Sequence, residues 1–288
     1  MTATRTAVDR AHIDAFARDG FVVVEDLFEE SELDEFGPAV DRAVADEQSA
    51  DTRPLADKSR YQQSFMQCQY LWMRSDGVRR FSCHPRLARA AAELLGAEAV
   101  RMWHDQALYK EPGGRRTDAH QDHAYWPLVE PSAITAWVPL DGSTRETGAM
   151  GYYPGSHRSG LDRFVNIFAD DDPEDLADDP VLAATEPVIV EVPKGSVAFH
   201  HARTAHFALA NESDRVRRVH TVIYIADGTH RGADGRHISV DFDGIRPGEV
   251  VAGQSTPILW PRPHDDLPDP PPGGGDAIVE LFKRLRGW

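Results

Sequence analysis

The chain has 288 residues, of which 41% are hydrophobic and 27% charged, and its formal net charge is -16 at pH 7. This composition is typical of a globular protein with a real core. The acidic balance disfavours nucleic acids and anionic membrane surfaces as partners, because both are bound through clustered Lys and Arg.

Cysteine content and the lack of an apolar targeting or membrane segment in the sequence indicate the expected cellular compartment. Cys68 and Cys83 are too few for a disulfide framework and form no CxxC pair. The N-terminal residues are polar, and no stretch of the sequence is long and apolar enough to predict a membrane span. We expect a cytoplasmic monomer or homodimer whose partner is a small molecule, neutral or cationic.

The first third of the chain is predicted to be mainly helical. Apolar residues at helical spacing predict helices over residues 9–19 and 87–95, each followed by a glycine. Residues 21–28 have the composition of a strand. Ser31 and Asp34 form a weak capping box for another helix between these segments.

From residue 99 to residue 226, strand-like runs broken by Gly and Pro follow one another without a helical pattern, which favours a sandwich or jelly roll. We expect one domain over residues 1–262, with its β core at about 99–226. Seven of the ten residues 170–179 are acidic, which predicts a solvated loop, with a lid over a pocket as the alternative. Residues 263–288 are predicted to be a Pro/Gly linker and a short amphipathic helix, whose apolar face would comprise Ile278, Leu281, Phe282 and Leu285.

Three His-x-Asp triplets occur, and they begin at His12, His120 and His264. The first lies in a predicted helix, where residues two apart point in nearly opposite directions and cannot share one ion. The last lies in the Pro-rich tail with no later histidine to complete a site. In an extended segment, residues two apart share a face, so His120 and Asp122 are the pair that can converge on a metal.

A metal site of the iron(II) oxygenase type needs a second histidine beside the carboxylate. His206 is favoured because it follows a strand that runs into a turn and precedes a run with basic residues. His200 and His201 are adjacent, so at most one can face inward, and we interpret both as ordinary strand histidines. The downstream candidates are His157, His200, His201, His206, His220, His230 and His237.

A buried arginine suits the distal carboxylate of a dicarboxylate co-substrate, because its planar fork pairs with a carboxylate through two hydrogen bonds. Strand alternation places Arg217 on the same face as Val219 and Thr221, which is the more apolar face. Arg218 falls on the other face. The same alternation, together with the isolated indole in TAWVPL, makes further polar and aromatic residues candidates to line the pocket: Gln106, Lys110 and Trp137.

These segments together resemble the phytanoyl-CoA dioxygenase family of Fe(II)/2-oxoglutarate oxygenases. The matching motifs are HDQALYKEPGG, DAHQDHAYWP, AITAWVPLDG, GAMGYYPGSHRSG and AHFALANESDRVRR, which lie in order between residues 103 and 218. The resemblance implies a double-stranded β-helix, a cupin-like jelly roll, with flanking helices and a helical N-terminal region. It also implies Fe(II), 2-oxoglutarate and O2 as cofactor and co-substrates.

By this resemblance, His120, Asp122 and His206 hold the iron and are the catalytic residues, and Arg217 binds 2-oxoglutarate. The resemblance also implies that the co-substrate pocket includes Gln106, Lys110 and Trp137. Family members often have a small hydroxylated residue two positions after the distal histidine, where this chain has Ala208. Related halogenases lack the carboxylate ligand, so Asp122 argues against halogenation.

The implied reaction is the oxidation of a C–H bond, by hydroxylation, desaturation, cyclisation or epimerisation. The substrate expected from charge and family breadth is a neutral or cationic natural-product intermediate, such as an amino sugar or a polycyclic scaffold. Alternatives are an acyl-CoA hydroxylase of the same family, a zinc-dependent hydrolase and a non-catalytic ligand-binding jelly roll. Candidates for the substrate side are Tyr125, Trp126, Phe65, Met66 and Trp72.

Overall fold

Two antiparallel sheets face each other in the computed structural model, which describes residues 8–49, 51–170, 174–233, 235–273 and 275. The major sheet has seven strands in the order β1-β8-β5-β10-β3-β11, with β2 paired to β3. Its strands are β1 Phe21–Val24, β2 Met66–Gln69, β3 Val100–Lys110, β5 Ala133–Pro139, β8 Val197–His201, β10 Arg217–Ala226 and β11 Ile258–Trp260.

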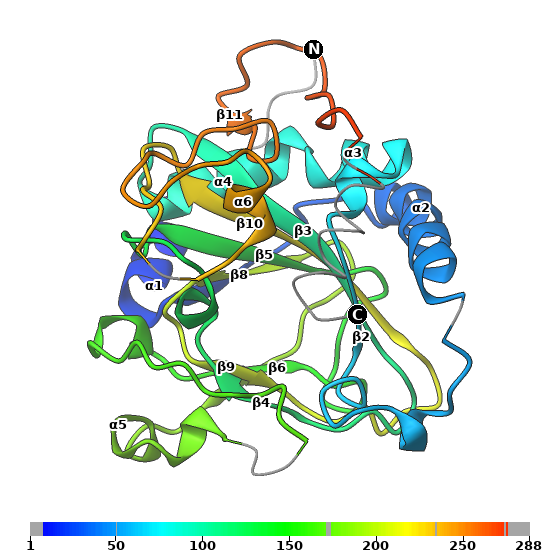
Figure 1. Ribbon diagram of the computed structural model, residues 1–288. Helices are drawn as coiled ribbons and strands as arrows, with labels where there is room; N and C mark the ends of the chain where they lie inside the picture. The colour runs from blue at the N-terminus through cyan, green and yellow to red at the C-terminus, as the bar shows by residue number, and fades with distance from the viewer. Residues whose placement is uncertain (1–7, 50, 171–173, 234, 274, 276–288) are drawn as a thin grey trace.

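The minor sheet has four strands in the order β4-β9-β6-β7 and closes the other side of the sandwich (Figure 1). Consecutive strands of the core thus alternate between the sheets in several places, as they do in a jelly roll. The predicted mainly β fold with flanking helices is confirmed. The strands of the minor sheet are β4 Thr117–His120, β6 Met150–Tyr152, β7 Val188–Val190 and β9 His206–Ala208.

Helices cover the face of the major sheet that is turned away from the minor sheet, and α4 lies directly on it (Figure 1). The largest core cluster forms there, where apolar side chains of α4 such as Leu87 meet strand residues such as Val222. The helices are α1 Arg10–Asp19, α2 Glu30–Gln48, α3 Asp76–Ser82, α4 Pro85–Leu95, α5 Pro180–Ala183 and α6 Ile238–Asp241. Short 3-10 turns are η1 Leu55–Asp57, η2 Leu71–Met73, η3 Asp122–Tyr125, η4 Ser156–Arg158 and η5 Leu176–Asp178.

The predicted capping box of the second helix is wrong by two residues. The reciprocal side-chain to backbone bonds are made by Glu29 and Glu32, so α2 begins earlier than Ser31 and Asp34 suggested. A glutamate can accept the same backbone N–H as a serine, and sequence statistics favour the shorter side chain. Helices α1 and α4 end as predicted, each at a glycine with left-handed backbone.

The acidic segment is less solvated than predicted in its described part. Leu176 is buried in a small apolar cluster, and the Asp175 carboxylate accepts from the backbone N–H of Ala119 at 3.0 Å and pairs with Arg116. Residues 171–173 and the predicted C-terminal helix lie outside the described residues. Of the helices in the described chain, none has the length and apolar character of a membrane span.

Candidate metal centre and active site

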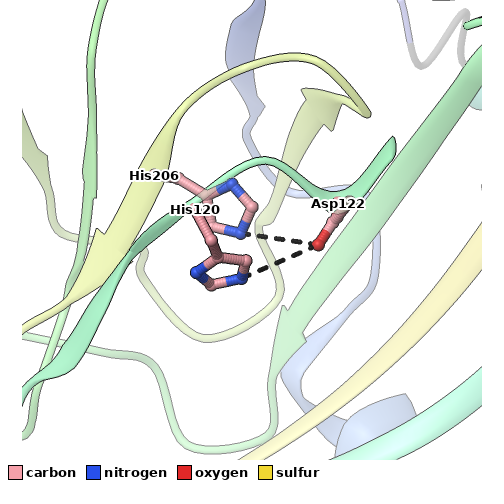
Figure 2. Close-up of side chains that lie close together, drawn as sticks. All are labelled: His120, Asp122 and His206. Carbon is pink, nitrogen blue, oxygen red and sulfur yellow. Dashed lines mark ion pairs between the residues drawn. The ribbon is translucent and has the colours of Figure 1, made fainter. Parts of the chain in front are cut away.

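Three predicted metal ligands meet between the sheets, as Figure 2 shows. His120 ends β4 and pairs in register with His206, the first residue of β9. Their Nε2 atoms lie 3.8 and 3.7 Å from Oδ1 of Asp122, and the three candidate ligand atoms all fall within 4.8 Å of one another. The prediction of an extended segment through Asp122 is wrong, because Asp122 begins η3. The turn, and not strand alternation, brings its carboxylate to the histidines.

Backbone carbonyls set the tautomers of the two histidines. Nδ1 of His120 lies 2.9 Å from the Asp118 carbonyl oxygen, and Nδ1 of His206 lies 2.9 Å from that of Thr204. A carbonyl only accepts, so each Nδ1 carries the proton and each Nε2 presents a lone pair to the centre. Burial lowers the pKa of both rings to about 4, which keeps them neutral at physiological pH and able to bind a metal.

The two oxygens of Asp122 have different surroundings. Oδ1 faces the two histidines, whereas Oδ2 accepts from the Thr135 hydroxyl at 2.9 Å and lies 3.2 Å from Nε2 of His200. Burial alone would raise the pKa of this carboxyl, but His206, His200 and His120 outweigh it and hold the pKa well below its usual range. Sequence reasoning missed His200, although alternation allowed one member of the His200–His201 pair to face inward.

A cavity of about 370 Å³ opens beside the three ligands and is lined by both sheets. Arg217 is buried in its wall, donates to the Gly148 carbonyl at 2.6 Å and stacks its guanidinium 5.4 Å from the Trp137 ring centroid. Its Nε has no hydrogen-bond partner, and no ion pair of the described residues includes it. Burial lowers the pKa of Arg217 to about 10, so it remains a cation without a protein anion.

Of the two polar candidates on β3, one lines the cavity and the other does not. Gln106 lines the cavity, where its Oε1 accepts from Gln67 at 2.7 Å and from Gln69 at 3.2 Å. Lys110 does not line it, contrary to prediction, because its Nζ donates to the Arg115 carbonyl and the Thr117 hydroxyl beyond the end of the strand. Burial, and then the neighbouring Arg217 charge, lower the pKa of Lys110 well below its ordinary value.

On the substrate side, Tyr125, Trp126 and Phe65 line the cavity as predicted. Met66 and Trp72 do not, because both pack into the main core behind the sheet. Four further aromatic residues of the cavity lining were missed, namely Tyr61, Tyr70, Phe168 and Phe207, and Phe168 in the loop after β6 could not be placed by strand periodicity. We call the resulting group the aromatic wall: Tyr61, Phe65, Tyr125 and Phe168.

The aromatic wall extends from the metal ligands toward the surface. The Tyr125 ring lies 5.9 Å from that of His120 and 5.8 Å from that of Phe168, whose side chain is 47% exposed. Tyr61 then contacts Phe168 and Phe65 at centroid distances of 4.5 and 5.0 Å. Another part of the cavity lining is more polar and contains Tyr70, His104, Arg236 and His237.

The comparison with known families decides the identity of this fold and site. The family model "Phytanoyl-CoA dioxygenase (PhyH)" matches residues 16–219, which include His120, Asp122, His206 and Arg217. The chain belongs to the phytanoyl-CoA dioxygenase family. This is a family of Fe(II)/2-oxoglutarate-dependent dioxygenases, and the predicted resemblance is confirmed.

Individual proteins that are similar in sequence or structure to this chain act on different small molecules. A probable alpha-ketoglutarate-dependent hypophosphite dioxygenase of Stutzerimonas stutzeri is 30% identical over 195 residues, a match that spans 65% of this chain and 65% of that protein, less than two thirds of its length. The crystal structure of the carbocyclase SnoK from nogalamycin biosynthesis is 28% identical and superposes with a TM-score of 0.72 over 87% of this chain and 96% of SnoK.

A second enzyme of nogalamycin biosynthesis has been crystallised with its site filled. The epimerase SnoN, in complex with Fe3+, alpha-ketoglutarate and nogalamycin RO, is 25% identical and has a TM-score of 0.70 over 86% of this chain and 97% of SnoN. Iron and 2-oxoglutarate are thus the cofactor and co-substrate that homologous structures contain, and the His-Asp-His group is present here.

Proposed function

We propose that this protein is an Fe(II)- and 2-oxoglutarate-dependent dioxygenase that oxidises a C–H bond of an uncharged small molecule. His120, Asp122 and His206 hold the iron, and Arg217 pairs with the distal carboxylate of 2-oxoglutarate. The observation that carries the proposal is a buried guanidinium with no protein anion in the wall of the cavity that contains the His-Asp-His group.

The donor set fits ferrous iron. Two neutral imidazoles and one carboxylate form a facial triad that leaves positions for a bidentate co-substrate and O2. The same ligands suit zinc, but a zinc hydrolase has no need of a buried arginine reserved for a dicarboxylate. An unpaired buried cation is costly, and a carboxylate that forms two hydrogen bonds with it removes that cost. Arg217 therefore supports the dioxygenase over the hydrolase and over a non-catalytic jelly roll.

The chain's own residues position and shield the reaction. When bound with 2-oxoglutarate and O2, iron supplies an oxidant that removes a hydrogen atom from a nearby C–H bond. Arg217 fixes one end of the co-substrate, Trp137 packs on the guanidinium, and Gln106 presents an amide on the neighbouring strand. The aromatic wall excludes water and holds the substrate carbon in place. Which of hydroxylation, desaturation, cyclisation or epimerisation follows depends on the substrate held there.

The residues that line the cavity limit the class of substrate. Asp122 is the only carboxylate among the described residues that line it, and the iron uses that charge, so nothing there pairs with a substrate cation. We therefore propose a neutral compound, seated with a flat or apolar part against the aromatic wall, in preference to a cationic amino sugar. The roles of SnoK and SnoN in nogalamycin biosynthesis support a natural-product intermediate.

An acyl-CoA is less well supported. Its phosphates need several free cations. Arg236 lines the cavity and is in no ion pair of the described residues, but three other basic side chains are engaged: Lys58 pairs with Glu111 at 2.6 Å, and both Arg60 and Arg115 pair with Asp118. Displacing a carboxylate from each of these would offset much of what a phosphate gains.

The test is anaerobic addition of Fe(II) and 2-oxoglutarate, with detection of the visible charge-transfer band of the chelate. The wild type is expected to give the band, and a His206→Ala, Arg217→Ala double variant to lose it. After admission of O2, succinate formation is measured with panels of neutral polycyclic compounds, amines and acyl-CoAs. Absence of the band in the wild type contradicts the iron assignment, and preferential turnover of amines or acyl-CoAs contradicts the substrate class.

A further inference from the structure

The major sheet contributes none of the three proposed metal ligands, but two of its side chains contact one of them, Asp122. His120 and His206 belong to the minor sheet, and Asp122 follows β4. Thr135 of β5 and His200 of β8 are register partners on neighbouring strands of the major sheet, and both face the cavity. Both meet the same atom, Oδ2 of Asp122, at 2.9 and 3.2 Å.

The direction of each hydrogen bond follows from the acceptor. An ionised carboxylate only accepts, so the Thr135 hydroxyl and Nε2 of His200 both donate to Oδ2. The other ring nitrogen of His200, Nδ1, lies 3.3 Å from the hydroxyl of Tyr152. Tyr152 and His200 are both buried and their rings pack at a centroid distance of 5.4 Å, so His200 is fixed from behind.

We propose that His200, together with Thr135, is a positioning residue that makes Asp122 a single-oxygen metal ligand through Oδ1. The inference rests on the proposed iron site. Two donors occupy the lone pairs of Oδ2 that would otherwise turn toward the metal, while Oδ1 stays directed at the two histidine Nε2 atoms. A carboxylate that chelated through both oxygens would take a coordination position that the co-substrate and O2 require.

The experiment uses cobalt(II) as a redox-stable probe of the full-length protein and measures its dissociation constant and its visible absorption, which reports coordination number. His200→Phe keeps a ring against Tyr152 but removes the donor. We expect its cobalt affinity to fall ~10- to 100-fold, as is typical when a group that orients a ligand is lost, and its absorption to change. His200→Gln keeps an N–H donor and is expected to recover most of the affinity.

His201→Phe is the matched control, because its ring lies on the other side of β8 against Phe16 and His157 and should leave both readouts at the wild-type values. Thr135→Val removes the second donor and carries the test if His200→Phe does not fold by circular dichroism. Unchanged affinity and absorption in the folded variants would overturn the inference alone. A wild type that binds no cobalt would overturn the proposed function with it.

Discussion

The two faces of the major sheet carry the same residue types in two buried clusters with opposite properties. On the cavity face, Asp122 lies among His120, His200 and His206. On the helix-covered face, Asp105 of β3 accepts from the Ser82 hydroxyl at 2.7 Å, and that hydroxyl lies 2.7 Å from Nε2 of His220. These three residues are fully buried and do not line the cavity beside the metal ligands.

The charge states of the two aspartates differ because their partners differ. Burial raises the pKa of Asp105 to about 7, and the neutral donors Ser82 and the Trp72 backbone N–H offset that only in part. The Asp122 side chain is 19% exposed, and its histidine neighbours hold its pKa well below the usual range. Burial also lowers the pKa of His220 to about 3. A serine, a histidine and an aspartate in contact are therefore not a catalytic site here, since serine stands between the other two and no substrate can reach it.

The largest effect expected from this comparison separates the two aspartates. Asp122→Asn should abolish 2-oxoglutarate turnover and the anaerobic charge-transfer band, because a neutral amide is a poor ligand for iron and cannot balance its charge. Asp105→Asn should retain both, because the amide oxygen can still accept from Ser82. Succinate formation and the band measure the outcome. Equal losses in the two variants would mean that the clusters are not functionally distinct.

A second, smaller effect separates two neighbouring arginines of β10. Arg217 faces the cavity, whereas Arg218 faces outward and pairs with Asp141 and Asp41. Arg217→Met should weaken 2-oxoglutarate binding by ~10- to 100-fold, since hydrogen bonds between charged groups contribute about 1.5–3 kcal/mol. Arg218→Met should leave that affinity near the wild-type value and cost less than about 1 kcal/mol of stability, as for a partly exposed ion pair. Titration of the charge-transfer band with 2-oxoglutarate gives both constants, and a comparable weakening in Arg218→Met would contradict the assignment.

Sequence reasoning succeeded where the structure is periodic. Alternation along β10 and β3 placed Arg217 and Gln106 toward the cavity, and helical spacing with a terminal glycine located α1 and α4. It failed where a strand ends or a loop folds back. Lys110 is the last residue of β3 and is the register partner of Arg217, as alternation requires, but its Nζ donates to the Arg115 carbonyl and the Thr117 hydroxyl and does not line the cavity.

The remaining misses depend on contacts between residues far apart in the chain. Phe168 reaches the cavity through the loop after β6, which no local pattern predicts. His200 became meaningful only when the β5–β8 register placed it beside Thr135. The motif around His120 and Asp122 was identified correctly as a pair, but its geometry comes from a turn that the extended-strand argument did not anticipate.

The smallest expected effect is a difference in the pH dependence of stability. The folded-state pKa of Asp105, about 7, lies above its ordinary value of 3.8, so between these values the folded protein binds more protons than the unfolded chain. The contribution of Asp105 is therefore fully present below about pH 4 and is lost as the pH rises through 7, with a slope of at most about 1.4 kcal/mol per pH unit.

Buried histidines change stability with pH in the opposite direction. Because the pKa values of residues such as His220 and His206 are lowered, the wild type and Asp105→Asn both become less stable as the pH falls from 6.5 toward 4. These histidines are common to the wild type and Asp105→Asn. His206 lies in the other cluster and cancels in the difference between the two metal-free proteins, whereas His220 lies 3.6 Å from Asp105 and has a pKa of about 3, below the pH range compared. We expect the free energy of unfolding of the wild type, measured by urea denaturation, to decline relative to that of Asp105→Asn between pH 4 and 7. Parallel curves would show that Asp105 stays ionised when buried, and the contrast with Asp122 would then lie in access to the cavity alone.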